Sequence, residues 1–166
     1  LISYGLKLKE KDVFAFIYNF IGASYVALKK YKDAIKYYNY SISIDDKYYE
    51  AYVNLAEVYR ILEEFDNAIY VAKKALKLDK DKTRALFVLA NTFDNSNQVE
   101  KAIIYYNKVL ETDTFNYLAN NNLGILYQKK YEFKKSFHCY QIALEHSPNS
   151  HEIYNNIGLL LKNIGQ

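Results

Sequence analysis

The chain repeats itself with a fixed period of 34 residues. Aromatic side chains mark the period at Tyr25, Tyr59, Phe93 and Tyr127. Small residues keep the same interval at Ala34, Ala68, Ala102 and Ser136, and again at Gly22, Ala56, Ala90, Gly124 and Gly158. Several series in one register indicate stacked helix-turn-helix units, each of which buries its apolar face on the next.

The period divides the chain into units. Complete units cover 15–48, 49–82, 83–116 and 117–150, and 151–166 forms the first helix of a fifth. Apolar residues at spacings of three and four predict helices at 16–28, 32–44, 49–62, 66–78, 83–95, 99–112, 117–129, 133–146 and 151–164.

The ends of two segments show further local signals. Residues 1–14 do not match the first half of a unit, but Gly5 to Lys9 resembles the end of a second helix. We therefore expect 1–14 to be the end of a preceding repeat or a cap helix, joined by a slightly longer connector. The spacing of Asn149 and Glu152 predicts a capping box for the last helix.

Composition excludes several classes of protein. Hydrophobic residues make up 51% and charged residues 25%, which favours a folded chain over a disordered one. The 22 basic and 19 acidic residues are interspersed without a long run of one sign, so no nucleic-acid tail is predicted. The single cysteine, Cys139, excludes an intramolecular disulfide framework and favours an intracellular, cytoplasmic location.

One uncharged stretch requires a membrane test. Val13 to Leu28 is 16 residues long, and about 20 are needed to span a bilayer. Asn19 and Ser24 interrupt the stretch, and Tyr25 lies on the repeat series. The prediction is a repeat helix and no membrane insertion.

The repeat resembles the tetratricopeptide repeat, whose signature is a bulky residue, Leu-Gly, Tyr, Ala, an aromatic residue, Ala and Pro. The first unit matches it at Tyr18, Ile21, Gly22, Tyr25, Ala34 and Tyr38. The later units depart from it at Ala72, where an aromatic residue is usual, and at Asn120, where a bulky one is. The resemblance covers 15–166 and implies an all-α, right-handed superhelical solenoid of antiparallel helix pairs. It also implies that Gly22 and its equivalents lie where two helices nearly touch.

The resemblance also places a concave groove along the first helix of each unit. Positions expected to face that groove hold Asn19, Asn54, Arg84, Asn91, Asn121, Asn122 and Asn156. Because an amide offers both a donor and an acceptor, such a row can pair with the backbone of an extended peptide. The row is similar to the asparagine ladder of O-linked N-acetylglucosamine transferases, although Phe20 and Val88 interrupt it. The competing interpretation is that asparagine is simply common in this chain.

The first helix of the array has a different character. Phe16 and Phe20 share a face with Ala23 and Ala27. This apolar end of the groove is either a pocket for a partner's helix or hydrophobic anchor, or a surface covered by a preceding unit or a dimer partner.

No catalytic or metal site is recognisable. His138, His146, His151 and Cys139 do not have the spacing of a compact ligand set, and no cofactor motif is present. Of the positions at which some tetratricopeptide arrays clamp a chaperone's C-terminal carboxylate, only Asn54 and Arg84 match, so that role is not expected.

The function predicted is a non-catalytic scaffold that binds other proteins through an extended peptide or helix, within a multi-subunit complex. The alternative is the substrate-recruiting region of an enzyme similar to O-linked N-acetylglucosamine transferase. An RNA-reading helical array is disfavoured, because such repeats have a period of 35 and basic residues do not line the groove.

Overall fold

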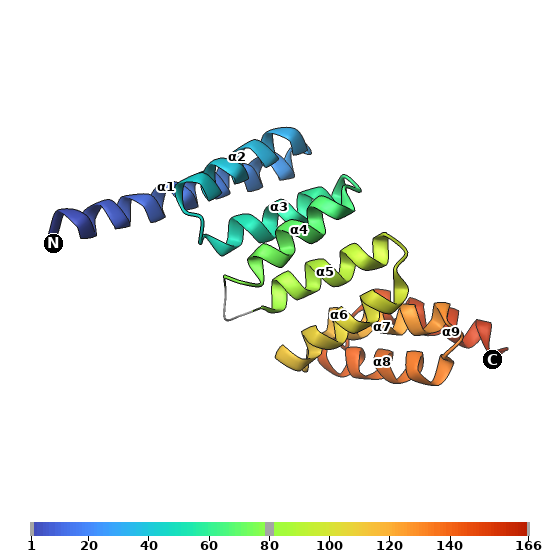
Figure 1. Ribbon diagram of the computed structural model, residues 1–166. Helices are drawn as coiled ribbons and strands as arrows, with labels where there is room; N and C mark the ends of the chain where they lie inside the picture. The colour runs from blue at the N-terminus through green and yellow to red at the C-terminus, as the bar shows by residue number, and fades with distance from the viewer. Residues whose placement is uncertain (1, 79–81, 166) are drawn as a thin grey trace.

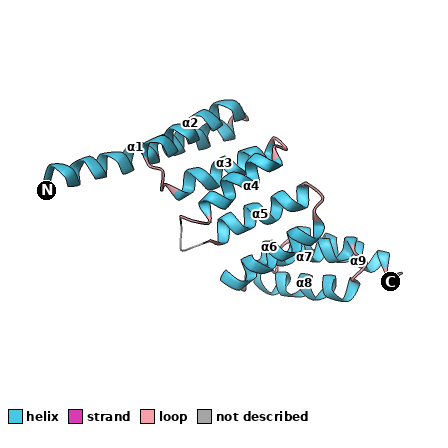
Figure 2. Cartoon of the chain, in the orientation of Figure 1, coloured by secondary structure: helices cyan, strands magenta, loops and turns pink. Residues whose placement is uncertain are grey.

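The computed structural model describes residues 2–78 and 82–165, in which all regular structure is helical (Figures 1 and 2). In these residues the helices are α1 (Ile2–Ala27), α2 (Tyr31–Ile44), α3 (Tyr49–Ile61), α4 (Phe65–Ala75), α5 (Thr83–Asn95), α6 (Val99–Thr112), α7 (Tyr117–Lys129), α8 (Phe133–His146) and α9 (His151–Asn163). The predicted all-α class is confirmed.

The helices form consecutive hairpins that stack along one direction (Figure 1). The hairpins are α1–α2, α3–α4, α5–α6 and α7–α8, and α9 packs on the last of them. The first helices of neighbouring units also contact each other, α1 with α3, α3 with α5, and α7 with α9. The result is the predicted solenoid, with its core distributed along the stack.

The longer connector expected within residues 1–14, before the first complete unit, is absent. Helix α1 runs without a break from Ile2 to Ala27, and its first half extends past the hairpin (Figure 1). The segment 6–13 contains neither glycine nor proline and is rich in leucine and lysine, which are good helix formers. Nothing in the local sequence therefore ends the helix.

Two other helix ends differ from expectation. Helix α4 ends at Ala75 and not at residue 78, because Lys77 and Leu78 donate to carbonyls only three residues earlier. The N-cap of α9 is Ser150 and not Asn149, and its hydroxyl accepts from the backbone N–H of Ile153 at 3.5 Å. A hydroxyl one residue later thus replaces the predicted amide cap.

Each hairpin turns on a residue in the left-handed backbone region. Positive φ angles of 58–60° recur every 34 residues at Lys29, Glu63, Asn97 and Tyr131. In the first turn, Lys29 N–H donates to the Val26 carbonyl at 2.8 Å and Lys30 N–H to the Tyr25 carbonyl at 2.9 Å. These two bonds form a Schellman motif, in which glycine is normally preferred.

Replacing Lys29 with glycine should stabilise the protein. Glycine removes the cost of about 1–2 kcal/mol that an L-residue incurs in this conformation. Part of this gain is offset, because glycine also raises the conformational entropy of the unfolded chain. We expect the free energy of unfolding to rise by about 0.5–1 kcal/mol in urea titrations. The control Lys36→Gly changes an exposed lysine inside α2 and should lower it by a similar amount. Equal effects of the two substitutions would contradict the left-handed, strained conformation assigned to Lys29.

Glycine is required where the two helices of a hairpin meet. A methyl group on Gly22 would lie 2.7 Å from Cε1 of Tyr38, and one on Gly124 would overlap the ring of Tyr140. The expected close approach at these positions is therefore confirmed. Gly158 on α9 differs, because nothing lies within 4 Å of the place its side chain would occupy.

Three tyrosines form the centre of their hairpins. Tyr38, Tyr106 and Tyr140 are no more than 2% exposed. Burial raises the pKa of Tyr38 and of Tyr140 to about 12, and it also raises the pKa of Tyr106. Each of these phenols must stay neutral while the chain is folded.

Alkaline pH should therefore unfold the protein through these tyrosines. An unfolded tyrosine ionises near pH 10, so the stabilising contribution is complete below pH 10 and is lost as the pH rises to 12. A shift of this size corresponds to at most about 2–3 kcal/mol for Tyr38 and the same for Tyr140. Urea titrations from pH 8 upward should show the loss, and Tyr140→Phe should reduce its steepness. An unchanged slope in that variant would contradict the role of Tyr140.

Candidate functional site

Asparagines on successive first helices are hydrogen bonded to one another. Asn54 on α3 donates through Nδ2 to Oδ1 of Asn19 on α1 at 2.9 Å. Asn156 on α9 donates to Oδ1 of Asn121 on α7, also at 2.9 Å. Both pairs are 35 residues apart, because the sixth position of one unit faces the fifth position of the unit before it. These amides join neighbouring units.

A third polar link connects α5, α6 and α7. The Tyr106 hydroxyl donates to Oδ1 of Asn91 at 2.6 Å. Asn122 donates through Nδ2 to the Tyr106 hydroxyl at 2.9 Å and to Asn91 Oδ1 at 3.4 Å. The repeat pattern assigned Tyr106 to the packing signature, but the hydrogen-bonding role of its hydroxyl was not predicted. The sequence feature that could have indicated this role is the pair of asparagines, Asn91 and Asn122, on the two flanking first helices.

Asn121 does not belong to the groove surface. It is 2% exposed, and its Nδ2 donates to Oε1 of Glu152 at 3.1 Å while its Oδ1 accepts from Asn156. Each polar atom of Asn121 thus has a partner inside the protein, and its burial keeps the remaining donor and lone pair away from the groove surface. Its position under Glu152 and Asn156 of α9 therefore does not support the prediction that it contacts a peptide.

The other asparagines retain unpaired atoms. In the part of the chain that the structure describes, no protein partner is found for Nδ2 of Asn19 and Asn91, or for Oδ1 of Asn122 and Asn156. Asn54 is fully paired, since its Oδ1 accepts from Nη2 of Arg84 at 3.2 Å. Two donors and two acceptors therefore remain along the half-buried row of first helices.

A pocket of about 220 Å³ lies between α3 and α5. Asn54, Arg84, Phe87 and Asn91 are among its lining residues. Its one acidic residue, Glu57, is held by Arg60 through bonds of 3.1 and 2.5 Å. Arg84 is exposed and makes no ion pair with any described residue. The pocket thus presents an uncompensated positive charge beside an aromatic surface.

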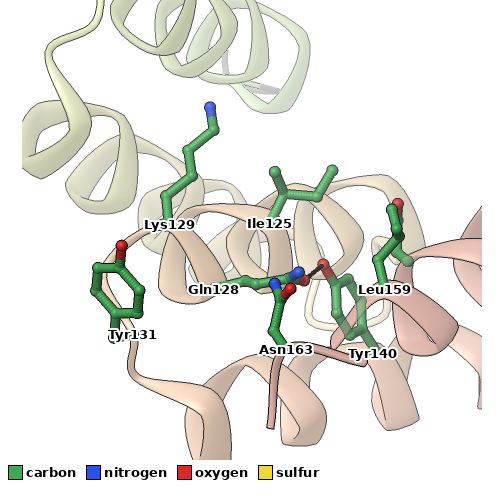
Figure 3. Close-up of a pocket in the computed structure, with 8 residues that line it drawn as sticks. Ile125, Gln128, Lys129, Tyr131, Tyr140, Leu159 and Asn163 are labelled. Atoms are coloured by element: carbon green, nitrogen blue, oxygen red, sulfur yellow. Dashed lines mark hydrogen bonds between the residues drawn. The ribbon is translucent and has the colours of Figure 1, made fainter. Parts of the chain in front are cut away.

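A second pocket, of about 320 Å³, lies between α7 and α9 (Figure 3). The Tyr140 hydroxyl donates to Oε1 of Gln128 at 3.1 Å, and Asn163 lies beside this pair. Lys129 points away from them, and its Nζ forms an ion pair with Asp94 at 3.2 Å. The pocket therefore offers amide and apolar contacts, while its lysine is already neutralised.

Phe16 and Phe20 form an exposed apolar surface on α1. Their ring centroids are 6.5 Å apart, and the side chains are 56% and 64% exposed. The apolar contact with a partner that was expected at this end stays a prediction, and the structure provides an exposed pair of stacked rings for it.

Other ionisable and reactive groups give no further site. Among the described residues, no three histidine, cysteine, aspartate or glutamate side chains are placed to hold a metal ion. Burial raises the pKa of Cys139 to about 11, which keeps the thiol protonated. None of the helices in the described ranges combines the length and apolarity needed to span a bilayer.

A solenoid of helical hairpins with a polar row on its first helices defines a class of repeat proteins. The chain belongs to the tetratricopeptide repeat family, whose model matches residues 17–48, 49–82 and 83–116. No significant sequence relative was found among curated proteins.

Solved structures share the fold. MamA is 23% identical, with a TM-score of 0.76, over 87% of this chain and 85% of that one. A chain of the APC/C hetero-tetramer Cut9-Hcn1 is 19% identical, with a TM-score of 0.81, over 90% of this chain and 30% of that one. The first tetratricopeptide array of Spaghetti (RPAP3), bound to the HSP90 peptide SRMEEVD, is 25% identical, with a TM-score of 0.68, over 72% of this chain and 95% of that one.

Proposed function

We propose that this chain is a non-catalytic scaffold that holds an extended segment of a partner protein along its first helices. The observation that carries the proposal is the row of unpaired amide atoms along the first helices, from Asn19 on α1 past the first pocket to Asn156 at the second. Asn91 and Asn122 lie at its centre, with Arg84 at one pocket and Asn156 at the other. An extended backbone presents alternating donors and acceptors that such a row can pair.

The energetics suit recognition of a backbone. Each hydrogen bond contributes about 0.5–1.5 kcal/mol, so four of them raise affinity by roughly a thousandfold. Side-chain selectivity then comes from the pockets. Arg84 favours an acidic side chain in the first pocket, because no described carboxylate neutralises it there.

Two of the similar structures support a protein partner. The Spaghetti array is bound to a peptide, and the Cut9 array belongs to a multi-subunit assembly. By analogy, we propose that this chain also acts inside a larger complex. We do not expect the partner to be the C-terminal peptide of a chaperone. Of the two residues that match the positions of such a carboxylate clamp, Asn54 already has a protein partner at both its amide nitrogen and its amide oxygen.

The charge of Arg84 provides the test. A twelve-residue peptide selected from a display library on the immobilised protein would be labelled, and its Kd measured by fluorescence anisotropy. We expect Arg84→Glu to weaken binding at least tenfold, because the charge in the pocket is reversed. Arg84→Lys should weaken it less. Asn39→Ala, an exposed change on α2, should have no effect.

One result would contradict the proposed role of Arg84 in peptide binding. If selected peptides bind Arg84→Glu and the wild-type protein with the same Kd, the groove between α3 and α5 is not where they bind. Equal helicity of the variants by circular dichroism would exclude unfolding as the cause of any loss.

A further inference from the structure

Helix α1 exposes an apolar face on the side opposite its hairpin. Ala15 and Gly22 are buried, and the Ser41 hydroxyl of α2 donates to the Ala15 carbonyl at 2.7 Å. The opposite face follows the spacing of an α-helical packing seam. Its exposed members are Val13, Phe16, Ile17, Phe20, Ala23, Ser24 and Ala27.

This face has no polar group that resists burial. No charged residue occurs from Val13 to Leu28. The hydroxyl of Ser24 already donates to the Phe20 carbonyl of its own helix at 3.0 Å. Removing the face from water would leave no unpaired donor, so the gain from apolar burial is not offset.

Side-chain size along the face is graded. Val13, Phe16 and Ile17 are bulky and lie toward the start of the helix, whereas Ala23, Ser24 and Ala27 are small and lie toward its end. If two copies of α1 cross in antiparallel order at Phe20, residue 13 faces residue 27 and residues 16 and 17 face 24 and 23. Bulky side chains then lie opposite small ones on both sides of the crossing point.

A two-fold axis through Phe20 produces each of these contacts twice, once on either side of the crossing point. Side-chain size on this face is thus complementary to itself under one symmetry operation, which is the property that a dimer interface between identical chains requires.

We propose that α1 is a homodimerisation helix that pairs in antiparallel order with α1 of a second copy. The exposed surface of all the residues on this face, taken from two copies, amounts to roughly 1,000 Å², near the lower limit for a specific interface. The occupant is a second copy of this chain because the face is complementary to itself. Lysines such as Lys11 and Lys29 flank the uncharged stretch, as they also would on a membrane-surface helix, so the vesicle experiment below separates the two occupants.

Charge substitutions at the symmetry axis test the proposal. Analytical ultracentrifugation of the whole chain over a wide range of concentration should show a reversible dimer. Phe20→Glu and Phe20→Lys should each raise the dimer dissociation constant about tenfold or more, because like charges meet on the axis. A mixture of the two variants should dimerise again. Phe115→Glu is the control, since Phe115 is 65% exposed on a connector far along the chain from α1.

Cross-linking tests the order of the helices. In a Cys139→Ser background, Val13→Cys mixed with Ala27→Cys should form a disulfide-linked pair, whereas Val13→Cys alone should not. A monomer at every concentration, or a dimer that Phe20→Glu does not weaken, would overturn the proposal. So would binding to phosphatidylcholine vesicles that depends on Phe20 and occurs without dimerisation. Binding of the selected peptide to the groove is measured separately and fails or succeeds independently of this result.

Discussion

Gly124→Leu is expected to abolish the stable packing of the α7–α8 hairpin. A side chain at this position would overlap the ring of Tyr140, which is fully buried. Overpacking costs about 1–3 kcal/mol where the core can relax and more where it cannot, so we expect a loss of at least about 3 kcal/mol. Thermal and urea unfolding followed by circular dichroism would measure it.

Gly158→Leu is the matched control. Gly158 is the equivalent residue on α9, and nothing lies within 4 Å of the new side chain's first carbon. Because leucine is the better helix former, this variant should gain up to about 1 kcal/mol. If both variants lose the same stability, the contact with Tyr140 is not the reason that position 124 holds glycine.

Tyr106→Ala is expected to be the most damaging aromatic truncation. The side chain is 1% exposed, and its removal leaves a cavity between α5 and α6 at a cost of about 3–5 kcal/mol. It also removes the hydroxyl that links Asn91 with Asn122. Tyr106→Phe keeps the ring and loses only that link, so its cost should be about 1–2 kcal/mol.

An exposed tyrosine serves as the control that shows whether burial, and not the loss of any tyrosine, causes the effect. Tyr154 on α9 is 55% exposed, and Tyr154→Ala should change the free energy of unfolding by less than about 0.5 kcal/mol. Urea titration of the three variants under identical conditions gives the comparison. A loss in Tyr106→Ala no larger than that in Tyr154→Ala would contradict the central role assigned to Tyr106.

The 34-residue period predicted the packing between paired helices well. Gly22 and Gly124 contact the aromatic residues that lie on their partner helices, as their positions in the repeat indicated. This succeeds because the two helices of a hairpin are close in sequence, so a single period records which residues face each other. The extent of α1 was not predicted, because the likeness of Gly5–Lys9 to the end of a second helix indicated a connector where the helix in fact continues.

Contacts between units were harder to predict. The asparagines pair at a separation of 35 residues, one more than the period, because each hairpin is displaced relative to the one before it. A sequence period shows which positions are equivalent, but not this displacement. Asn19 and Asn121 occupy equivalent positions, yet only Asn121 is buried, because Glu152 of the following helix binds it.

The left-handed residue that recurs at each hairpin turn also restricts how the molecule can move. Two hydrogen bonds close the turn around Lys29, and equivalent bonds close those around Glu63, Asn97 and Tyr131, so we expect the two helices of a hairpin to move together. Any change in the curvature of the solenoid is then a rotation of whole hairpins about connectors such as 113–116 and 147–150. A bound segment would select one curvature from those that the connectors allow, and the amide pairs between first helices would stretch or shorten together with it.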